Sequence, residues 1–571
     1  MKYFFRFSVA AISLMFATLT IAQTAILSER DIFTPTIATH GMVVTGEEIA
    51  AQVGVEVLQK GGNAVDAAVT IGFVKAVSYP RAGNIGGGGF MLIYSAKTKK
   101  VIAIDYREKA PLNATRDMFL DKKGNVDSNL SKFSYLSAGV PGTVAGMAMA
   151  LEKYGTLSLA DALAPAIVIA EKGFVMTPAF SDDIKKRAKL LKKHPTTAAI
   201  FFKPDGSFYE AGDRLVQNDL ANTLKAIAKN GIKAFYEGKI ADMIVRDMEA
   251  HGGLISKEDL TNYQPKLRKP IHGTYRGYDI YSMSPPSSGG VHIVQILNIL
   301  ENYDIGLLGH NTAATIHLMA EAMKRAYADR SKYLGDTDFV SVPLTGLTSK
   351  VYAAALSQQI NRQKASVSQD ILQGKPTLYE SNETTHYSVV DKEGNAVSNT
   401  YTINFSFGSG IVVNGAGFLL NNEMDDFSAK PGVANAYGLI GGTANAIEPK
   451  KRMLSSMSPT IVLKDGKPFI VTGSPGGSRI ITTTLQVIMN VIDHNLNIQE
   501  ATNAVRIHHQ WLPDEIRVEK GLSLDTFKLL TEMGHKVVVK NTMGAAASIL
   551  IDQSTLHGSH DPRRQGMALG Y

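Results

Sequence analysis

Cysteine is absent from all 571 residues of the chain. This absence excludes disulfide bonds, thiol catalysis and thiolate metal sites together. Beyond the N-terminal segment, no stretch is apolar over the ~18 residues that a membrane-spanning helix needs. A chain of this length can bury a core large enough to fold without covalent cross-links. Its stability must therefore come from packing.

The sequence also lacks several common catalytic motifs. It contains neither G-x-S-x-G nor H-E-x-x-H, and its 14 histidines show no metal-ligand spacing. The run NIGGGG, Asn84–Gly89, lacks the Gly-Lys-Ser/Thr that completes a phosphate-binding loop. It is instead typical of a place where two backbone segments pack closely. We therefore expect no metal and no organic cofactor.

The N-terminal segment has the pattern of a secretory signal peptide. Lys2 and Arg6 form a basic region, Phe7 to Ile21 is apolar, and Ala22 is a small residue at a cleavage position. The alternative is a short membrane anchor, but the run is shorter than the ~18 residues needed. We expect cleavage after Ala22 and an exported protein without an anchor, periplasmic or secreted.

The chain is basic, with a formal charge of +7 and a pI near 9.0. The densest cluster is KKRAKLLKKH, from Lys185 to His194. Such a cluster can bind acidic surfaces, but it is more often a solvated helix face. No aromatic interleaving or nucleic-acid motif accompanies it, so no nucleic-acid partner is expected.

Hydrophobic periodicity predicts helices alternating with hairpins. Apolar residues recur at helical spacing in three segments. These are residues 47–60, the segment after 311, and 478–494. Strand, polar turn and strand follow one another in three others, 89–108, 386–404 and 459–474, the last turning at Asp465-Gly466. The pattern predicts an α+β fold in which helices cover antiparallel sheets.

Two threonines, Thr384 and Thr385, stand at the head of the second hairpin. If its turn centres on Glu393, the numbers of paired residues sum to 786, and Thr384 faces Thr402. Opposed residues have Cβ atoms about 4.5–5.5 Å apart, close enough for their hydroxyls to interact. Threonine favours β-strands, so the pair can have a structural role only, but one member can also be a nucleophile.

Five long motifs closely resemble the γ-glutamyltranspeptidases, and the likeness runs from about residue 35 to DPRRQGMALG near the C-terminus. They are IDYREKAP, ETTHYSVVDKEGNA, NNEMDDFSAKPG, KRMLSSMSPTIV and GSPGGSRIITTT. This family belongs to the N-terminal nucleophile hydrolases, so the resemblance implies a four-layer αββα sandwich. It also implies self-cleavage between Glu383 and Thr384. Residues 1–22 would be the signal peptide, 23–383 the large subunit and 384–571 the small catalytic subunit, joined as a heterodimer.

Self-cleavage explains why a threonine should follow the cut. A hydroxyl is a weak nucleophile without a base, whereas a free N-terminal amine has an unperturbed pKa of about 7.7–8.0 and can accept its proton. Cleavage thus makes the nucleophile and its base from one residue, Thr384. By resemblance, Thr402 orients the Thr384 hydroxyl. His386 is then not needed as a base, and we interpret it as structural.

The remaining motif residues are assigned by the same resemblance. Arg107 suits the α-carboxylate of a γ-glutamyl group, because its planar fork binds two oxygens. Ser455 and Ser456 would donate to that carboxylate. The acidic residues Glu423 and Asp426 would bind the α-ammonium, together with Asn404.

Two further features are implied around the reacting carbonyl. Gly476 and Gly477 stand at the expected start of a helix, where free N–H groups can form an oxyanion hole. Tyr437, in the glycine-rich segment 431–442, would belong to a lid over the donor.

The resemblance implies a γ-glutamyltransferase and glutathione hydrolase. The γ-glutamyl group of glutathione or a related compound would form an ester on Thr384. Water, an amino acid or a dipeptide would then accept it. The alternatives are a glutaryl-type β-lactam acylase of the same superfamily and a processed binding protein without turnover. Retention of Thr384 argues against the binding protein, which needs no nucleophile.

Overall fold

The computed structural model describes residues 31–372, 374, 385–430 and 442–571. The expected signal peptide, Glu383, Thr384 and Tyr437 lie outside these residues. Within the described ranges, no helix has the length and hydropathy to span a bilayer.

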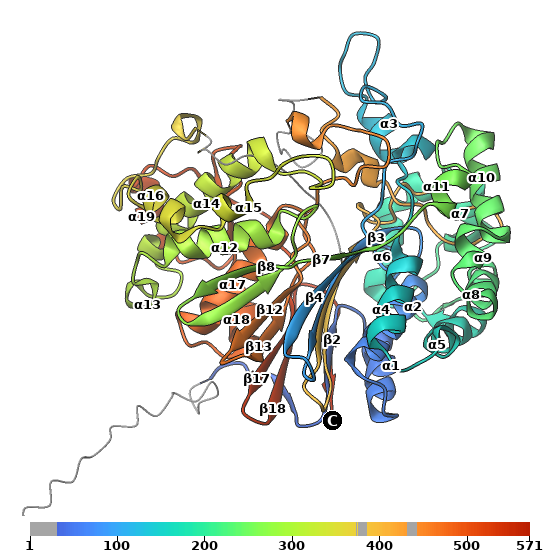
Figure 1. Ribbon diagram of the computed structural model, residues 1–571, viewed down its shortest axis with the longest axis horizontal. Helices are drawn as coiled ribbons and strands as arrows, with labels where there is room; N and C mark the ends of the chain where they lie inside the picture. The colour runs from blue at the N-terminus through green and yellow to red at the C-terminus, as the bar shows by residue number, and fades with distance from the viewer. Residues whose placement is uncertain (1–30, 373, 375–384, 431–441) are drawn as a thin grey trace, which may run out of the picture.

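Two seven-stranded sheets lie face to face at the centre of the described chain (Figure 1), and neighbouring strands in each are antiparallel. In order, the first sheet contains β19 (Met567–Gly570), β2 (Met42–Thr45), β10 (Thr385–Val390), β11 (Ala396–Thr402), β3 (Gly88–Ser95), β4 (Lys100–Asp105) and β7 (Lys266–Arg268). The second contains β1 (Thr36–Ala38), β18 (Thr555–His560), β17 (Ala547–Asp552), β13 (Lys467–Thr472), β12 (Thr460–Lys464), β9 (Tyr278–Ser282) and β8 (Ile271–Tyr275).

Helices cover the outer face of each sheet (Figure 1). The first sheet is covered mainly by α1 (Glu48–Gln59), α2 (Ala64–Ser78), α4 (Thr143–Tyr154), α5 (Leu159–Lys172) and α8 (Asn218–Asn230). The second is covered mainly by α12 (Gly289–Leu300), α14 (Ala313–Tyr333), α17 (Arg479–Ile492) and α18 (Ile498–Asn503). The expected αββα sandwich is therefore confirmed.

Further elements surround these layers in the described chain. They include α3 (Ser128–Phe133), α6 (Pro178–Leu191), α7 (Pro195–Phe201), α9 (Lys233–Tyr236), α10 (Lys239–His251), α11 (Lys257–Thr261), α13 (Ile305–Leu308), α15 (Leu344–Leu347), α16 (Lys350–Ser357) and α19 (Leu524–Glu532). The one-turn helix η3 (Glu423–Asp426) carries two of the expected site residues. Small sheets join β5 (Phe174–Val175) to β6 (Arg214–Leu215), and β14 (Ile507–His508) to β15 (Ile516–Val518) and β16 (Val537–Val539).

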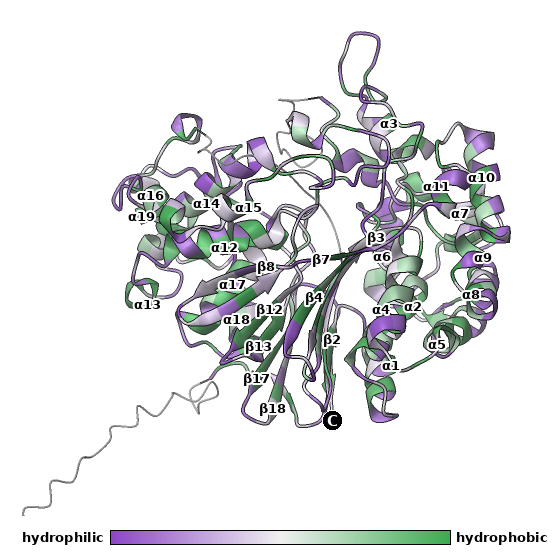
Figure 2. Cartoon of the chain, viewed as in Figure 1, coloured by the Kyte–Doolittle hydropathy of each residue, from purple (hydrophilic) through white to green (hydrophobic). Residues whose placement is uncertain are grey.

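The core is divided into layers by the sheets. Apolar side chains such as Phe90, Leu92, Ile461 and Val471 fill the space between the two sheets. Separate clusters lie between each sheet and its helices. Burying one such aliphatic or aromatic side chain completely contributes about 1.5–3 kcal/mol to the free energy of folding. Figure 2 shows apolar residues concentrated on the central strands and polar residues on the outward faces of the helices.

The three predicted helices are confirmed as α1, α14 and α17, with one correction. Helix α17 begins at Arg479, so Gly476 and Gly477 lie in the turn before it. Their φ angles of 138° and 64° are not helical. Such angles are accessible to glycine at no steric cost, which explains why the pair ends the loop instead of starting the helix.

The three predicted hairpins are also confirmed. In the central one, Val390 pairs with Ala396 and Thr385 with Tyr401, which is the expected register. In the last one, Asp465 and Gly466 both have positive φ, at 51° and 76°. A type I′ turn requires this at both central positions.

The NIGGGG run is a place of close backbone approach, as expected. A Cβ added at Gly86 would collide with the carbonyl oxygen of Leu419, and one at Gly87 with the carbonyl oxygen of Thr402. Asn84 fastens the same segment, because its Nδ2 donates to the Thr402 carbonyl at 2.9 Å and its Oδ1 accepts from Gly87 N at 2.8 Å. The loop thus fixes the end of β11, where the candidate site begins.

We predict that Gly87→Ala destabilises the protein by about 1–3 kcal/mol or more, because the added methyl must displace the backbone at Thr402. Chemical denaturation would measure the loss. Gly346→Ala is the matched control, since a Cβ there meets no atom within 4 Å. Equal stability of the two variants would contradict the packing role of the loop.

Candidate active site

The site is built where β11 ends. Thr402 is the last residue of that strand, and its Oγ1 accepts from the backbone N–H of Asn404 at 2.7 Å. Asn404 has a φ of 70°, in the left-handed region that asparagine tolerates. Its Nδ2 donates to the carbonyl of Asn422 at 2.9 Å, and its buried Oδ1 has no hydrogen-bond partner among the described residues. The turn therefore joins the strand to η3 and leaves one buried acceptor available.

Arg107 lies at the centre of a buried ion-pair cluster. It follows β4 by two residues and is 1% exposed. Its Nη1 lies 2.6 Å from Glu423 Oε2, and its Nη2 lies 2.5 Å from Asp426 Oδ2. The guanidinium also donates to the carbonyls of Met453 at 3.2 Å and Leu454 at 3.4 Å. The structure thus brings together three expected site residues, although Arg107 lies more than 300 positions before the other two in the sequence.

This cluster contains more carboxylates than cations. Glu108 Oε2 lies 3.5 Å from the same guanidinium, and all three carboxylates are buried. Burial, together with the neighbouring acidic groups, raises the pKa of Glu423 to about 8 and that of Glu108 to about 7, against the pull of Arg107. Burial lowers the pKa of Arg107, but the surrounding carboxylates outweigh it and raise that pKa overall. The site can therefore hold protons that a cationic ligand would displace.

The serine pair follows the carbonyls that Arg107 contacts. Ser455 is fixed by backbone bonds to the neighbouring segment: its N–H donates to Pro286, and its carbonyl accepts from Ser288 N at 2.7 Å. Its Oγ accepts from Met457 N at 3.1 Å, and its hydroxyl proton has no acceptor among the described residues. The Ser455 hydroxyl can therefore act as a hydrogen-bond donor next to the carbonyls that Arg107 contacts.

Ser456 has a different partner, which sequence reasoning missed. Arg330 of α14 is fully buried and donates through Nη2 to Ser456 Oγ and through Nε to Ser288 Oγ at 3.0 Å. A signal for it existed, since Arg330 continues the apolar i, i+4 stripe of α14 through Met323 and Ala326. A charged residue on a buried helix face requires a polar partner.

The turn before α17 presents free backbone donors. The N–H groups of Gly476 and Gly477 have no acceptor recorded among the described residues, and both residues are buried. The turn is anchored to α14, because Tyr327 OH donates to the carbonyl of Ser478 at 2.5 Å. This arrangement has the features of an oxyanion hole.

Two buried groups flank the first residue of β10. His386 lies between Thr400 and Ser388, with ring nitrogens 2.9 Å and 3.1 Å from their hydroxyls. Burial lowers the pKa of His386 to about 3, so it is neutral, in agreement with a structural role. Lys75, which sequence reasoning missed, donates to Thr385 Oγ1 at 2.8 Å and to Thr45 Oγ1 at 3.0 Å. Burial lowers the pKa of Lys75 to about 7.

Among the described residues, one cluster has the composition of a metal site: His317, Glu321 and His535. However, His317 Nδ1 lies 2.7 Å from His535 Nε2, and Glu321 is paired with Lys324 at 3.1 Å and Arg325 at 2.8 Å. The two imidazoles thus contact each other, and Glu321 is already paired with two cations. The positive charge of Lys324 and Arg325 would repel a metal ion. We assign no metal there.

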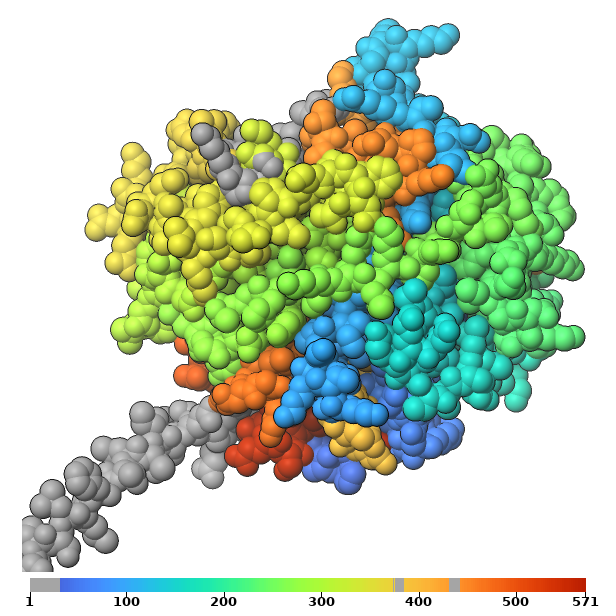
Figure 3. Space-filling view, viewed as in Figure 1, coloured from blue at the N-terminus to red at the C-terminus, as the bar shows by residue number. Residues whose placement is uncertain are grey.

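Glu383, Thr384 and Tyr437 lie outside the described residues, so their expected roles remain predictions. The other expected site residues are all buried, and they lie in five places: the segment after β4, the end of β11, η3, the serine pair and the turn before α17. Figure 3 shows the segment after β11, in orange, reaching the surface beside the blue segment around α3.

Comparison with known proteins identifies the family. The family model described as gamma-glutamyltranspeptidase matches residues 50–571. The chain is 57% identical over 537 residues to the glutathione hydrolase proenzyme of Escherichia coli strain K12, covering 94% of this chain and 92% of that protein. It is 40% identical over 511 residues to the acylase ACY 1 proenzyme of Pseudomonas sp. strain V22, covering 88% of each.

Solved structures agree with this result. The cephalosporin acylase from Bacillus halodurans matches with a TM-score of 0.85 at 29% identity, covering 96% of this chain and 98% of that one. A Helicobacter pylori gamma-glutamyltranspeptidase chain matches with a TM-score of 0.57 at 47% identity, covering 61% of this chain and 97% of that one. The fold and these relatives place the chain among the N-terminal nucleophile hydrolases. Within that class, the chain belongs to the γ-glutamyltranspeptidase family.

The charge imbalance predicts a pH-dependent effect of Glu423→Gln. Because the pKa of Glu423 is raised to about 8 in the folded state, the folded protein holds a proton that the unfolded chain releases above about pH 4.3. Its contribution to stability therefore falls as the pH rises through this window. Glutamine does not titrate, so the variant's Tm relative to wild type should increase on the order of 1–3 °C between about pH 5.5 and 8.5.

Differential scanning fluorimetry at the two pH values would measure this. Glu393→Gln, in the exposed turn of the β10–β11 hairpin, is the control and should show no such pH dependence. A Tm difference for Glu423→Gln that stays constant, or that falls as pH rises, would show that Glu423 is ionised throughout.

Proposed function

We propose that this protein is a γ-glutamyltransferase and glutathione hydrolase that matures by self-cleavage before Thr384. The observation that carries the proposal is the Arg107 cluster, which combines one buried guanidinium with Glu423 and Asp426. A γ-glutamyl group ends in an α-carboxylate and an α-ammonium, and this pair of charges matches the cluster. The glutathione hydrolase relative supports the choice of glutathione as a donor.

The binding step is an exchange of partners. The donor's α-carboxylate would take the guanidinium fork of Arg107 and the free proton of Ser455 Oγ. Asp426 and Glu423 would turn from Arg107 to the α-ammonium, and the unpartnered Oδ1 of Asn404 would accept from it. Each charged hydrogen bond contributes about 1.5–3 kcal/mol. Displacement of a proton from Glu423 would accompany binding.

The chemical steps would then follow at Thr384. In the precursor, its hydroxyl attacks the carbonyl carbon of Glu383, and the peptide bond is replaced by an ester that water hydrolyses. The freed α-amine then accepts the proton of the same hydroxyl as it attacks the donor's γ-carbonyl. The N–H groups of Gly476 and Gly477 would stabilise the oxyanion, where one donor is worth about 2.7–4 kcal/mol. The α-ammonium of Thr384 would give that proton to the nitrogen of the leaving amine, which departs and leaves the acyl group as an ester on Thr384. Water or an acceptor amine would then attack the ester, take the acyl group and release the Thr384 hydroxyl.

The two products of cleavage, 23–383 and 384–571, would stay together as a heterodimer. Strand β10 of the small subunit lies between β2 of the large subunit and β11, and β11 pairs with β3. Separation would expose these buried strand edges, which have no other partners. We further propose export, supported by the basic and apolar pattern of residues 1–22, with the periplasm as the expected location.

The maturation proposal is tested by Thr384→Ala. This variant should remain one uncut chain with no measurable activity, because the attacking hydroxyl and the product nucleophile are the same group. Thr385→Ser is the control: it keeps the hydroxyl that accepts from Lys75, and it should still be cut. Denaturing mass spectrometry would measure the chain masses of both variants and so distinguish cut from uncut protein. Cleavage of Thr384→Ala, or a new N-terminus at residue 385, would refute the assignment.

The recognition proposal is tested by Arg107→Lys. Lysine keeps the charge but loses the planar fork, so two charge-assisted hydrogen bonds weaken. We expect normal cleavage and a fall in kcat/KM for glutathione of about 100-fold. Steady-state kinetics on the cleaved variant would measure this. An unchanged kcat/KM would remove Arg107 from the carboxylate site.

A further inference from the structure

Helix α2 is buried along its whole length, and a lysine lies in its last turn. All 15 residues of α2 are buried, and Lys75 is 0% exposed. The only other charged residue of this helix is Asp66, which completes the capping box with Asn63 and accepts from Thr156 N at 2.7 Å. Burying a charged group costs free energy unless its partners compensate. The partners of Lys75 therefore determine whether its burial is costly.

No acid neutralises Lys75, which forms no ion pair with a described residue. Glu47 is the acidic group whose charge favours the ammonium, but its carboxylate already accepts from the first backbone N–H groups of α1 and from Ser78 Oγ. The ring centroids of Tyr79 and Tyr387 lie 5.6 Å and 5.3 Å from Nζ, and such cation–π contacts offset only part of the cost. Burial accordingly lowers the pKa of Lys75 to about 7.

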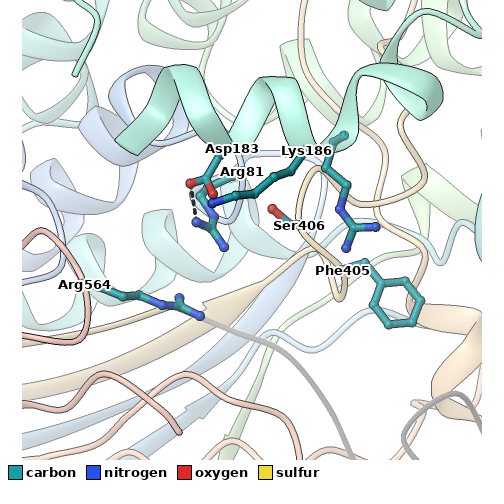
Figure 4. Close-up of a pocket in the computed structure, with 7 residues that line it drawn as sticks. Arg81, Asp183, Lys186, Phe405, Ser406 and Arg564 are labelled. Atoms are coloured by element: carbon teal, nitrogen blue, oxygen red, sulfur yellow. Dashed lines mark hydrogen bonds and ion pairs between the residues drawn. The ribbon is translucent and has the colours of Figure 1, made fainter. Parts of the chain in front are cut away.

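A second cation adds to this cost. The charge of Arg564 is close enough to lower the pKa of Lys75 further. Arg564 lines a cavity of about 490 Å³ together with Lys186 and Arg187 of α6 (Figure 4). Positive charge therefore faces Lys75 from this side, and an uncharged side chain of the same length would avoid the repulsion.

The terminal nitrogen of Lys75 connects the two expected subunits. It donates to Thr45 Oγ1 at 3.0 Å and to Thr385 Oγ1 at 2.8 Å. Thr45 is the last residue of β2, and Thr385 is the first residue of β10. The ladder between these strands ends at the pair formed by Thr45 and Tyr387, so Thr385 lies beyond it. Lys75 thus extends the connection between β2 and β10 to the residue that follows the proposed nucleophile.

A lysine in the last turn of a helix can also interact with the helix dipole, because the terminal carbonyls carry partial negative charge. That role requires Nζ to lie near those carbonyls. The Nζ of Lys75 instead contacts hydroxyls on two strands. Lys153 holds the corresponding position in α4 and is exposed. A comparison of these two lysines therefore separates the two roles.

We propose that Lys75 is a positioning residue for self-cleavage and for acyl transfer. It holds the side chain of Thr385 against α2 and β2. Because Thr384 is covalently bonded to Thr385, this contact limits the positions open to the nucleophile. The inference rests on the proposed function and assigns a large-subunit residue to the placement of the small-subunit nucleophile. Rates are sensitive to such placement, since a displacement of ~1 Å can cost about 100-fold.

A small set of substitutions tests this role. Lys75→Met keeps the length of the side chain and removes its N–H donors. Thr385→Val keeps the shape of the threonine and removes the acceptor, whereas Thr385→Ser keeps the acceptor. Lys153→Met is the matched control on α4. The double variant Lys75→Met/Thr385→Val tests whether the two residues act through one contact.

Three measurements are made on each variant. Cell-free synthesis stopped at intervals gives the rate at which new precursor is cut. Steady-state kinetics on the cleaved protein give kcat/KM for γ-glutamyl-p-nitroanilide and the inhibition constant of glutamate. Glutamate carries the same α-carboxylate and α-ammonium as the donor, so it reports on the Arg107 cluster without reacting. Differential scanning fluorimetry gives Tm.

We expect Lys75→Met to be cut about tenfold more slowly or worse and to lose about tenfold in kcat/KM, because the nucleophile is less well placed. The inhibition constant of glutamate should stay within about twofold of wild type, since ground-state binding is untouched. Its Tm should equal or exceed that of wild type, because a buried cation is removed. Thr385→Val should show the same losses, whereas Thr385→Ser and Lys153→Met should stay near wild type. The double variant should be no slower than Lys75→Met alone.

Three results would overturn the proposal. The first is unchanged cleavage and kcat/KM in Lys75→Met. The second is a loss that comes with a lower Tm and weaker glutamate binding, which would make Lys75 a structural residue. The third is a double variant whose loss is the product of the two single losses, because Lys75 would then not act through Thr385. A wild-type protein that is not cut before Thr384 and hydrolyses no γ-glutamyl donor would instead refute the proposed function, so the two failures are distinguishable.

Discussion

A single buried guanidinium, that of Arg107, faces three buried carboxylates, and the candidate site depends on this imbalance. Burial and mutual repulsion disfavour the ionised form of three carboxylates beside one cation, which raises the pKa of Glu423 and that of Glu108. A ligand with an α-ammonium and an α-carboxylate leaves the net charge unchanged, but it brings a cation to Glu423 and Asp426 and an anion to Arg107. The arrangement also joins the two expected subunits, because Arg107 precedes the expected cut and Glu423 and Asp426 follow it.

The sequence predicts most of the scaffold because local periodicity determines it. The stripes of α1, α14 and α17 and the polar turns of three hairpins are short-range patterns. Placing the turn of the central hairpin at Glu393 predicted its register from Val390 to Thr385. The start of α17 was misplaced because periodicity does not reveal the positive φ of Gly476 and Gly477. The partners of Arg330 and Lys75 could not be predicted, since those contacts join distant segments.

The site residues were found through motifs rather than through spacing. Arg107 and Asp426 are 319 positions apart, and no periodicity relates them. The structure adds the surroundings of these residues. It shows that the carboxylates are deeply buried and that two cations of the basic run on α6 line a cavity. Under the proposed function, the Arg107 cluster would bind the amino-acid end of a donor. The loop at Gly87 packs against the carbonyl of Thr402, at the end of β11 where the candidate site begins.

The ammonium of the donor distinguishes a γ-glutamyltranspeptidase from an acylase of the same fold, because a glutaryl group lacks it. The most direct measurement is the ratio of kcat/KM for γ-glutamyl-p-nitroanilide and glutaryl-p-nitroanilide. Glu423 and Asp426 would be left without a cation by the glutaryl donor, at a cost of about 1–3 kcal/mol or more for each unpaired buried group. A preference for the γ-glutamyl donor of about 100-fold or more is predicted. Equal values, or a glutaryl preference, would contradict it.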